Sequence, residues 1–198
     1  MAKLYFYYSA MNAGKTTTLL QSDYNYRERG MDTLMFIPSI DTRAVKGRIA
    51  SRIGLEKEAH SFDSDFDFFA FTEAYLGEHK SLACILIDEA QFLKKEQVEQ
   101  LCRITDELNV PVLAYGLRTD FKGEPFEGSK YLMSWAENLY EIKTICHCGR
   151  KATMNARVDA EGRPVWQGNQ IEIGGNERYV ALCRKHFFMD KPKVKEAA

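Results

Sequence analysis

The sequence predicts an α/β fold with a parallel sheet, followed by a small metal-binding unit that begins near residue 146. Two observations predict the sheet: apolar runs of strand length alternate with segments of helical length, and a small-residue loop motif follows the first run. A third observation, the close spacing of cysteines and histidines toward the carboxyl end, predicts the metal-binding unit.

The first apolar run, Leu4–Tyr8, leads into a loop of small residues that ends in Gly14-Lys15-Thr16. A strand, a small-residue turn and a helix start form the context in which such a loop binds phosphate, because its backbone N–H groups point at one anion. Lys15 would reach the β- and γ-phosphates of a nucleotide, and the Thr16 hydroxyl would coordinate Mg2+. Ser9 replaces the usual first glycine, and the alternative is a chance Gly-Lys-Thr at a helix start. The predicted nucleotide-binding residues of this loop are Ser9, Ala10, Met11, Asn12, Ala13, Gly14, Lys15 and Thr16.

Three predicted elements follow the loop and complete a β-α-β unit with a covering helix. They are a helix over about Thr16–Arg29 that ends before Gly30, a strand over Thr33–Ile37, and an aromatic amphipathic helix within Asp63–His79. The polar stretch 39–61 between the last two carries no clear element. It contains Arg43, which could contact phosphate or could be an ordinary solvated charge.

Cys84–Ile87 is a continuous apolar run typical of a strand that is buried on both faces. Asp88 and Glu89 follow it directly. Asp88 at the end of a buried strand, in a chain with a phosphate loop, is suited to hold Mg2+, and Glu89 would remain free to act on the nucleophile. The alternative is an acidic pair at a helix N-terminus, favoured by the helix dipole.

The chain then continues the alternation of helices and strands. The predicted elements are a helix over Lys94–Leu108, a strand over Val110–Tyr115, a short helix over Ser129–Ala136 and a last strand over Leu139–Ile145. The loop Gly116–Phe126 lies at the carboxyl end of a strand, so it should border the active site. Phe121 and Phe126 in this loop could be anchors or a platform for stacking a base.

The final part of the chain alternates short polar strands with turns. Cys146 and Cys148 are paired, at a distance of about 35 residues, with Cys183 and His186. Three thiolates and one imidazole fill a tetrahedral zinc site and leave no position for water, so the site should be structural. His147 competes with His186 as a ligand but is the weaker choice, and the alternative is a set of free thiols. Predicted strands here are Thr153–Val158, Ile171–Ile173 and Arg178–Leu182.

Composition limits the class of protein. The chain has 198 residues, of which 45% are hydrophobic, so it can bury a core, and its net charge of −1 gives no general attraction to nucleic acid or anionic membranes. The apolar runs are too short to span a bilayer, and the first residues lack a signal-peptide pattern. An odd number of cysteines, five, argues against a disulfide framework. We therefore expect a cytoplasmic protein.

Taken together, these motifs resemble the cellular, zinc-bearing type II thymidine kinases, and the bacterial ones most closely. The resemblance covers nearly the whole chain. It implies a RecA-like nucleotide-binding domain at 1–145 and a small zinc-bound lasso domain at 146–198 that closes over the nucleoside. It also implies ATP-dependent phosphorylation of the 5′-hydroxyl of thymidine or deoxyuridine, a homotetramer, and feedback inhibition by thymidine triphosphate (dTTP).

The resemblance also implies roles for individual residues. Glu89 would be the base that orients and deprotonates the 5′-hydroxyl, Asp88 and Thr16 would hold magnesium, and Arg43 and Gln91 would join the nucleotide-binding residues. The residues that would line the nucleoside pocket are Met11, Phe92, Leu117, Phe121, Phe126 and Tyr179, together with the backbone of Ile171, Glu172, Ile173 and Gly174, which would read the thymine edge.

Three other functions compete with this interpretation. A motor or helicase is suggested by Asp88-Glu89-Ala90-Gln91, but such enzymes normally need a second RecA-like domain and a basic binding surface. A non-catalytic zinc module that binds nucleic acid leaves the phosphate loop and Glu89 unexplained. A kinase for another small metabolite fits the residue pattern equally well, because no spacing in the sequence specifies thymine.

Overall fold

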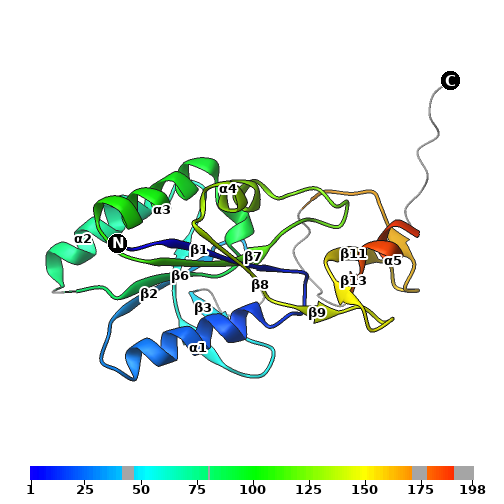
Figure 1. Ribbon diagram of the computed structural model, residues 1–198, viewed down its shortest axis with the longest axis horizontal. Helices are drawn as coiled ribbons and strands as arrows, with labels where there is room; N and C mark the ends of the chain where they lie inside the picture. Colours follow the sequence, from blue (N-terminus) through cyan, green and yellow to red (C-terminus); the bar gives the residue numbers. More distant parts are fainter. Residues whose placement is uncertain (42–46, 80, 171–177, 190–198) are drawn as a thin grey trace.

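One six-stranded sheet forms the centre of the molecule in this computed structural model, which describes residues 1–41, 47–79, 81–170 and 178–189 (Figure 1). In order across the sheet, the strands are β5 (His60–Phe62), β2 (Thr33–Pro38), β6 (Cys84–Ile87), β7 (Val112–Leu117), β1 (Leu4–Ser9) and β8 (Asn138–Glu141). Every pair of neighbours in this sheet is parallel, so all the carboxyl ends meet at one edge. The predicted α/β fold with a parallel sheet is confirmed.

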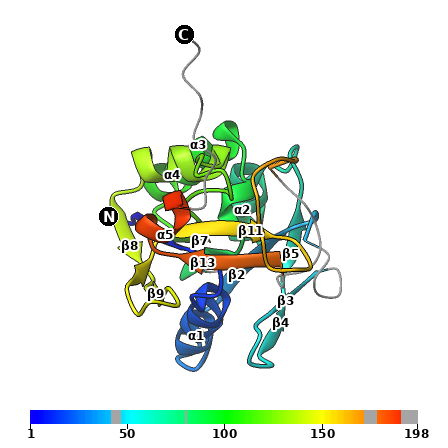
Figure 2. The same ribbon diagram turned by 90° about the vertical axis from the view of Figure 1, so that its right-hand side faces the viewer.

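Helices cover both faces of this sheet. They are α1 (Lys15–Arg27) on one face and α2 (Phe68–Glu78), α3 (Lys95–Glu107) and α4 (Glu127–Trp135) on the other, as Figures 1 and 2 show. The four residues of β6 are completely buried, as expected for a central strand with helices on both sides. Within the described residues, no helix combines the length and the apolar character that crossing a bilayer requires.

Two apolar clusters fill the space between the sheet and its helices. Phe68 of α2 and Val98, Leu101 and Ile104 of α3 pack on one face, while Leu19 of α1 packs on the other. Aromatic rings from the predicted helix around Phe68 contact Phe36 of β2, at centroid distances of 5.1 to 5.6 Å. The aromatic run therefore belongs to the core, and the rigid layers it stabilises hold the edge where the strands end.

The polar stretch before residue 62 differs from the expectation. It contains a small antiparallel hairpin of β3 (Arg48–Ala50) and β4 (Glu56–Glu58), and then β5, which joins the main sheet beside β2. All three strands are three residues long, and β4 is made of exposed charged residues. Such short, charged strands leave only weak periodicity in the sequence, so no strand could be assigned to this stretch from the sequence.

Two other predicted boundaries also need correction. The single strand expected over Leu139–Ile145 is two strands: β8 joins the main sheet, whereas β9 (Thr144–Ile145) pairs with β10 (Lys151–Ala152) in a separate ribbon. The helix expected to begin at Ser129 begins at Glu127 instead, where Glu127 accepts hydrogen bonds from Lys94 and Lys95. The predicted helix start was wrong because these contacts come from a distant part of the chain.

The carboxyl-terminal unit lies beside the edge of the main sheet where the strands end (Figure 1). Its sheet has β11 (Met154–Val158) at the centre, with β12 (Pro164–Val165) and β13 (Tyr179–Leu182) antiparallel on either side, followed by α5 (Arg184–Met189). The predicted strand at Ile171–Ile173 lies outside the described residues. This unit has its own small apolar cluster around Phe187, to which two cysteines contribute.

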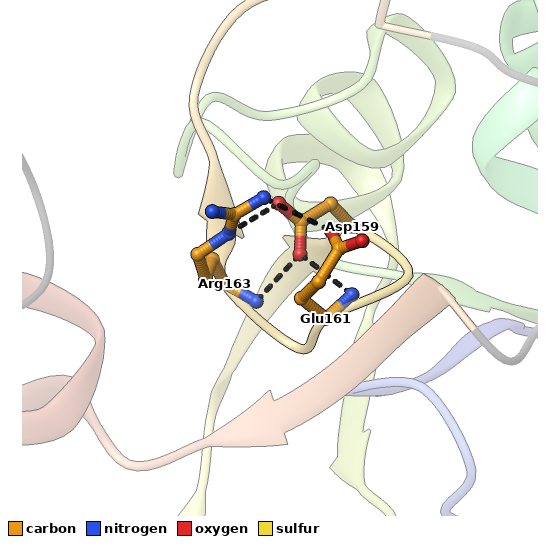
Figure 3. Close-up of polar contacts among 3 residues, drawn as sticks. All are labelled: Asp159, Glu161 and Arg163. Carbon is orange, nitrogen blue, oxygen red and sulfur yellow. Dashed lines mark hydrogen bonds and ion pairs between the residues drawn. The ribbon is translucent and has the colours of Figure 1, made fainter.

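A tight turn between β11 and β12 is fixed by the carboxylate of Asp159, as Figure 3 shows. One oxygen accepts hydrogen bonds from the backbone N–H groups of Glu161 (3.1 Å) and Arg163 (2.8 Å), and the other accepts from Arg163 Nε (2.9 Å). The backbone hydrogen bond from Arg163 keeps the pKa of this carboxyl below its ordinary value. Gly162 in this turn has a φ of 78°, a conformation that glycine adopts without strain.

Candidate active site

A cavity of about 440 Å3 opens where the strands of the main sheet end. The phosphate loop forms one wall, and Asp88, Glu89 and Leu117 reach it from the ends of β6 and β7. The wall from the β3–β4 hairpin, which the sequence did not reveal, consists of Ala50, Ser51, Arg52 and Ile53. The structure therefore brings the two predicted motifs, more than 70 residues apart, to one cavity.

The phosphate loop turns through two residues with positive φ, Asn12 at 62° and Gly14 at 86°. Because a glycine adopts this conformation without strain, Gly14 allows α1 to start directly at Lys15 with its N-terminus at the cavity. Lys15 Nζ donates to Ser9 Oγ (3.0 Å) and lies 3.4 Å from the carbonyl oxygen of Ala10. Ser9 thus supplies an oxygen that holds Lys15 over the loop, which a glycine could not do.

Thr16 and Asp88 meet at the base of the cavity. The Thr16 hydroxyl donates to Asp88 Oδ2 at 2.9 Å, and the Asp88 carboxylate is almost fully buried. Burial, and then the neighbouring charge of Glu89, raise the pKa of Asp88 to about 7. Two oxygen ligands side by side at a phosphate-binding loop fit the preference of Mg2+, which binds through few protein oxygens and the phosphates of its nucleotide.

Glu89 is held in an unusual backbone conformation. Its φ and ψ are 49° and 39°, in the left-handed region that a side chain rarely adopts, and this turn directs the chain from β6 into a short 3-10 helix. Gln91 donates from Nε2 to Glu89 Oε2 and accepts at Oε1 from the backbone N–H of Leu117, at 3.0 Å. Gln91 therefore fixes the carboxylate of Glu89 relative to the end of β7.

Gly128 explains why α4 can support this turn. A Cβ atom at Gly128 would lie 2.5 Å from the carbonyl oxygen of Ala90 and 2.9 Å from that of Leu93. Backbone atoms cannot yield at such distances, so only glycine allows α4 to pack directly on the turn that carries Glu89. A larger residue would displace the acidic pair from the cavity.

The four predicted zinc ligands come together in the carboxyl-terminal unit. One ligand atom of each of Cys146, Cys148, Cys183 and His186 lies within 4.8 Å of the others. The sulfur atoms of Cys148 and Cys183 are 3.8 Å apart, which is the edge of about 3.8 Å expected for a tetrahedron with Zn–S bonds near 2.3 Å. His186 Nδ1 lies 3.3 Å from the Cys146 sulfur. The donor set and its spacing therefore fit a closed structural zinc site.

Two further features support this cluster. Burial opposes ionisation of the Cys146 thiol, but hydrogen bonds from the backbone of Cys148 and from His186 outweigh it and lower the pKa of Cys146 to about 6. A thiol with a low pKa is ready to bind metal as a thiolate. The ring of His147 stacks on that of His186 at 4.3 Å, so His147 covers the cluster.

The aromatic residues predicted for the nucleoside pocket form two pairs. Phe92 and Phe126 meet edge to face at 5.9 Å. Phe121 is buried, and the guanidinium of Arg157 lies 3.8 Å from its ring and donates two hydrogen bonds to the Tyr179 hydroxyl. Of the other predicted residues, Met11 and Leu117 line the cavity, whereas Arg43, Ile171, Glu172, Ile173 and Gly174 lie outside the described residues.

Comparison with known proteins decides the family. The thymidine kinase family model matches residues 2–187. The thymidine kinase of Coxiella burnetii is 62% identical over 192 residues, covering 97% of this chain and 98% of the relative. Those of Legionella pneumophila strain Philadelphia 1 and Vibrio cholerae are 60% and 59% identical, over 98% and 94% of this chain and 93% and 97% of the relatives. The chain belongs to the thymidine kinase family. The resemblance seen in the motifs is confirmed.

Sequence reasoning missed two residues in this thymidine kinase family member, Asn155 and Arg157. Both are buried polar side chains of β11 that reach toward the main sheet. The predicted strand over Thr153–Val158 already contained the signal: these two residues alternate with Met154 and Ala156, so a strand must place them together on one face. Their partners, in distant loops, could not be read from the sequence.

Proposed function

We propose that this chain transfers the γ-phosphate of ATP to the 5′-hydroxyl of thymidine and so forms dTMP. Membership of the thymidine kinase family supports this reaction. The observation that carries the mechanism is the position of Glu89, a buried carboxylate held by Gln91 at the same cavity as the phosphate loop. In that position a carboxylate can orient a hydroxyl group toward a bound phosphate.

We assign the donor side of the reaction to the phosphate loop and Asp88. Backbone N–H groups of the loop and the N-terminus of α1 would bind the phosphates, and Lys15 would neutralise charge on the β- and γ-phosphates. Thr16 and Asp88 would hold magnesium, which supplies further charge neutralisation on the phosphates when it is bound. Arg43 is proposed for the same role by resemblance alone.

We assign proton transfer to Glu89. The 5′-oxygen attacks the γ-phosphorus as the bond from that phosphorus to the β,γ-bridging oxygen breaks, and ADP leaves with the bridging oxygen. Glu89 accepts the hydroxyl proton late in the reaction and then passes it to solvent. Because the transition state is loose, positioning of the hydroxyl contributes more than the basicity of the carboxylate.

The nucleoside would bind between the end of the main sheet and the carboxyl-terminal unit. Met11, Leu117 and Phe92 would contact it from the first region, and Phe121, Phe126 and Tyr179 would stack or pack around it. By resemblance, the backbone of residues 171–174 would read the thymine edge, and deoxyuridine would be accepted as a second substrate.

We further propose that residues 1–145 and 146–198 act as two domains, the second being a zinc-bound lasso that closes over the nucleoside. The ligand set Cys146, Cys148, Cys183 and His186 would carry zinc and leave no open position for substrate. Reduced thiols are required for this, and they are consistent with a cytoplasmic protein. A homotetramer and inhibition by dTTP, the end product, complete the proposal by resemblance to the family.

An assay that couples ADP release across a panel of nucleosides tests the reaction. We expect turnover with thymidine, and with deoxyuridine, and little with purine deoxynucleosides. Turnover of an unrelated metabolite but not of thymidine would show a kinase with another acceptor. ATP hydrolysis that needs single-stranded DNA instead of a nucleoside would contradict the proposal and support a nucleic-acid-dependent ATPase.

A further inference from the structure

Strand β11 has two faces that serve different parts of the molecule. Met154 and Ala156 belong to the apolar cluster of the carboxyl-terminal unit, together with Cys146 and Cys183. Asn155 and Arg157 alternate with them and are 2% and 5% exposed, although their partners lie in other elements. One rigid strand is thus anchored beside the thiol cluster on one face and reaches the active site with the other.

Asn155 makes one hydrogen bond to each side of the active site. Its Oδ1 accepts from the backbone N–H of Met11 in the phosphate loop (2.7 Å), and its Nδ2 donates to the backbone carbonyl of Thr119 (2.9 Å). Thr119 follows β7 in the loop that also carries Phe121. Because Met11 offers a donor and Thr119 an acceptor, only one orientation of the amide satisfies both. A single side chain therefore fixes the distance between the two loops.

Arg157 adds contacts on the side of the active site where the nucleoside, the phosphate acceptor, would bind. Its guanidinium lies on the ring of Phe121, donates to the hydroxyl of Tyr179, and donates to the carbonyl of Asn169 at 2.9 Å. Gln170 adds a hydrogen bond to Asp120 at 3.0 Å. Both sets of contacts hold the β7 loop to the carboxyl-terminal unit, whereas the hydrogen bond from Met11 to Asn155 holds the phosphate loop.

The β7 loop also contains a buried polar atom that is not satisfied. Thr119 Oγ1 is buried and has no hydrogen-bond partner among the residues that the structure describes. A buried hydroxyl without a partner is unfavourable, so a small shift of this loop that gave the hydroxyl a partner would be favoured. Asn155 would transmit such a shift to Met11, because a buried side chain with two hydrogen bonds cannot slide between them.

We propose that Asn155 is a positioning residue that couples nucleotide binding in the phosphate loop to nucleoside binding beyond the β7 loop. This inference rests on the proposed function, since it needs both substrates to use this cavity and its borders. Nucleotide binding fixes the Met11 backbone, Asn155 then fixes Thr119, and the loop holds Phe121 where the nucleoside binds. Each substrate should consequently bind more tightly when the other is present, and by the same factor.

Isothermal titration calorimetry of the full-length, zinc-loaded protein tests this coupling. The dissociation constant of thymidine is measured with and without saturating non-hydrolysable ATP analogue and Mg2+. We expect thymidine to bind the wild type about 5- to 150-fold more tightly with the analogue, the range typical of a coupling free energy between two sites. In Asn155→Leu, which keeps the size of the side chain but makes neither bond, the ratio should fall close to one.

Two control variants separate coupling from general damage. Ala156→Gly removes a methyl group on the opposite face of the same strand and should keep the wild-type ratio. Arg157→Lys should weaken thymidine binding in both states and leave the ratio nearly unchanged, because it removes contacts of Arg157 with Phe121 and Asn169 but keeps both hydrogen bonds of Asn155. Melting temperature and zinc content report folding, and Asn155→Ala replaces Asn155→Leu if the latter does not fold.

The outcomes are distinct. A wild-type ratio of one, or an unchanged ratio in both Asn155 variants, overturns the coupling. A ratio lost equally in Ala156→Gly also overturns it, because the effect would then come from the strand as a whole. Thymidine turnover is measured on the same wild-type preparation: turnover without a binding ratio refutes only the coupling, whereas absence of turnover refutes the proposed function.

Discussion

The main sheet and the carboxyl-terminal unit are held together by different forces. The sheet region has two large apolar clusters on its two faces, with β6 completely buried between them. The cluster of the carboxyl-terminal unit is small, and Cys146 and Cys183 are part of it, so its packing depends on the same residues as its metal site. In a region of that size, metal binding would supply folding free energy that the small apolar cluster does not provide.

The proposed reactive groups and the side chains that position the surrounding loops therefore lie in different regions. The charged groups at the cavity, Lys15, Asp88 and Glu89, stand on the region that apolar packing makes rigid. The carboxyl-terminal unit contributes hydrogen bonds and ring contacts, through Asn155 and Arg157, instead of reactive groups at the cavity. Changes in the first region should therefore reduce turnover, and changes in the second should reduce nucleoside binding.

The largest effect is expected from Glu89→Gln. The amide keeps the size of the side chain but cannot accept the hydroxyl proton, so kcat should fall about 10²- to 10⁴-fold. Affinity for the ATP analogue should change little, because the role proposed for Glu89 is toward the hydroxyl of the nucleoside. Steady-state kinetics and calorimetry measure the two quantities, and Glu124→Gln, an exposed carboxylate of the β7 loop, is the matched control. Near-normal turnover in Glu89→Gln would remove this residue from the mechanism.

Zinc removal should act on the other region. Treatment with a chelator, or Cys148→Ser, should raise the KM for thymidine by about tenfold or more. Mutation of a single outer-shell partner of a metal ligand already costs about 10- to 100-fold in metal affinity or activity, and removal of the metal should cost at least as much. Affinity for the ATP analogue should be largely retained. Cys102→Ser, a half-buried thiol of α3 outside the cluster, is the control. Thymidine affinity that survives complete loss of zinc contradicts a metal-dependent lasso.

Asp88→Asn tests how the buried carboxyl group at the cavity affects the folding stability of the sheet region. Burial and the charge of Glu89 raise the pKa of Asp88 from 3.8 to about 7, so the folded protein binds this proton more tightly than the unfolded chain does. The extra stability that the protonated carboxyl gives the folded protein is therefore fully present below about pH 4, and it is lost as the pH rises through about 7. Asparagine does not titrate. Without magnesium, the melting temperature of Asp88→Asn relative to wild type should therefore rise from pH 4 to pH 7 and then level off. A constant difference would contradict this.

The two regions also differ in how much the sequence could predict. In the sheet region, long apolar runs such as Cys84–Ile87 and the loop around Lys15 follow local patterns, and the structure has them where expected. The failures there, β3 to β5, are short strands whose charged residues leave only weak periodicity. The role of a residue can be predicted from the sequence when it follows from local spacing, but not when it depends on partners far away in the chain.

The carboxyl-terminal unit illustrates both halves of this rule. The cluster of Cys146, Cys148, Cys183 and His186 was predictable because a metal site requires fixed ligand types at close spacing. Asn155 was not, because its partners Met11 and Thr119 come from two other loops that only the fold brings together. Gln91 was predicted as a nucleotide-binding residue by resemblance, but its hydrogen bonds with Glu89 and Leu117 could not be read from the sequence.

The smallest effect is expected from Asp159→Ala, in the turn between β11 and β12. The change removes the hydrogen bonds of the carboxylate with Glu161 and Arg163, but the turn is exposed, and solvent-exposed ion pairs contribute little to stability. The KM for thymidine should change less than about twofold, because exposed pairs of this kind often contribute nothing measurable. Hydrogen exchange should nevertheless be faster at Glu161 and Arg163, whose N–H groups lose their acceptor. If the KM rose as much as after zinc removal, the carboxyl-terminal unit would depend on its turns as strongly as on its metal, and the division of forces between the two regions would be wrong.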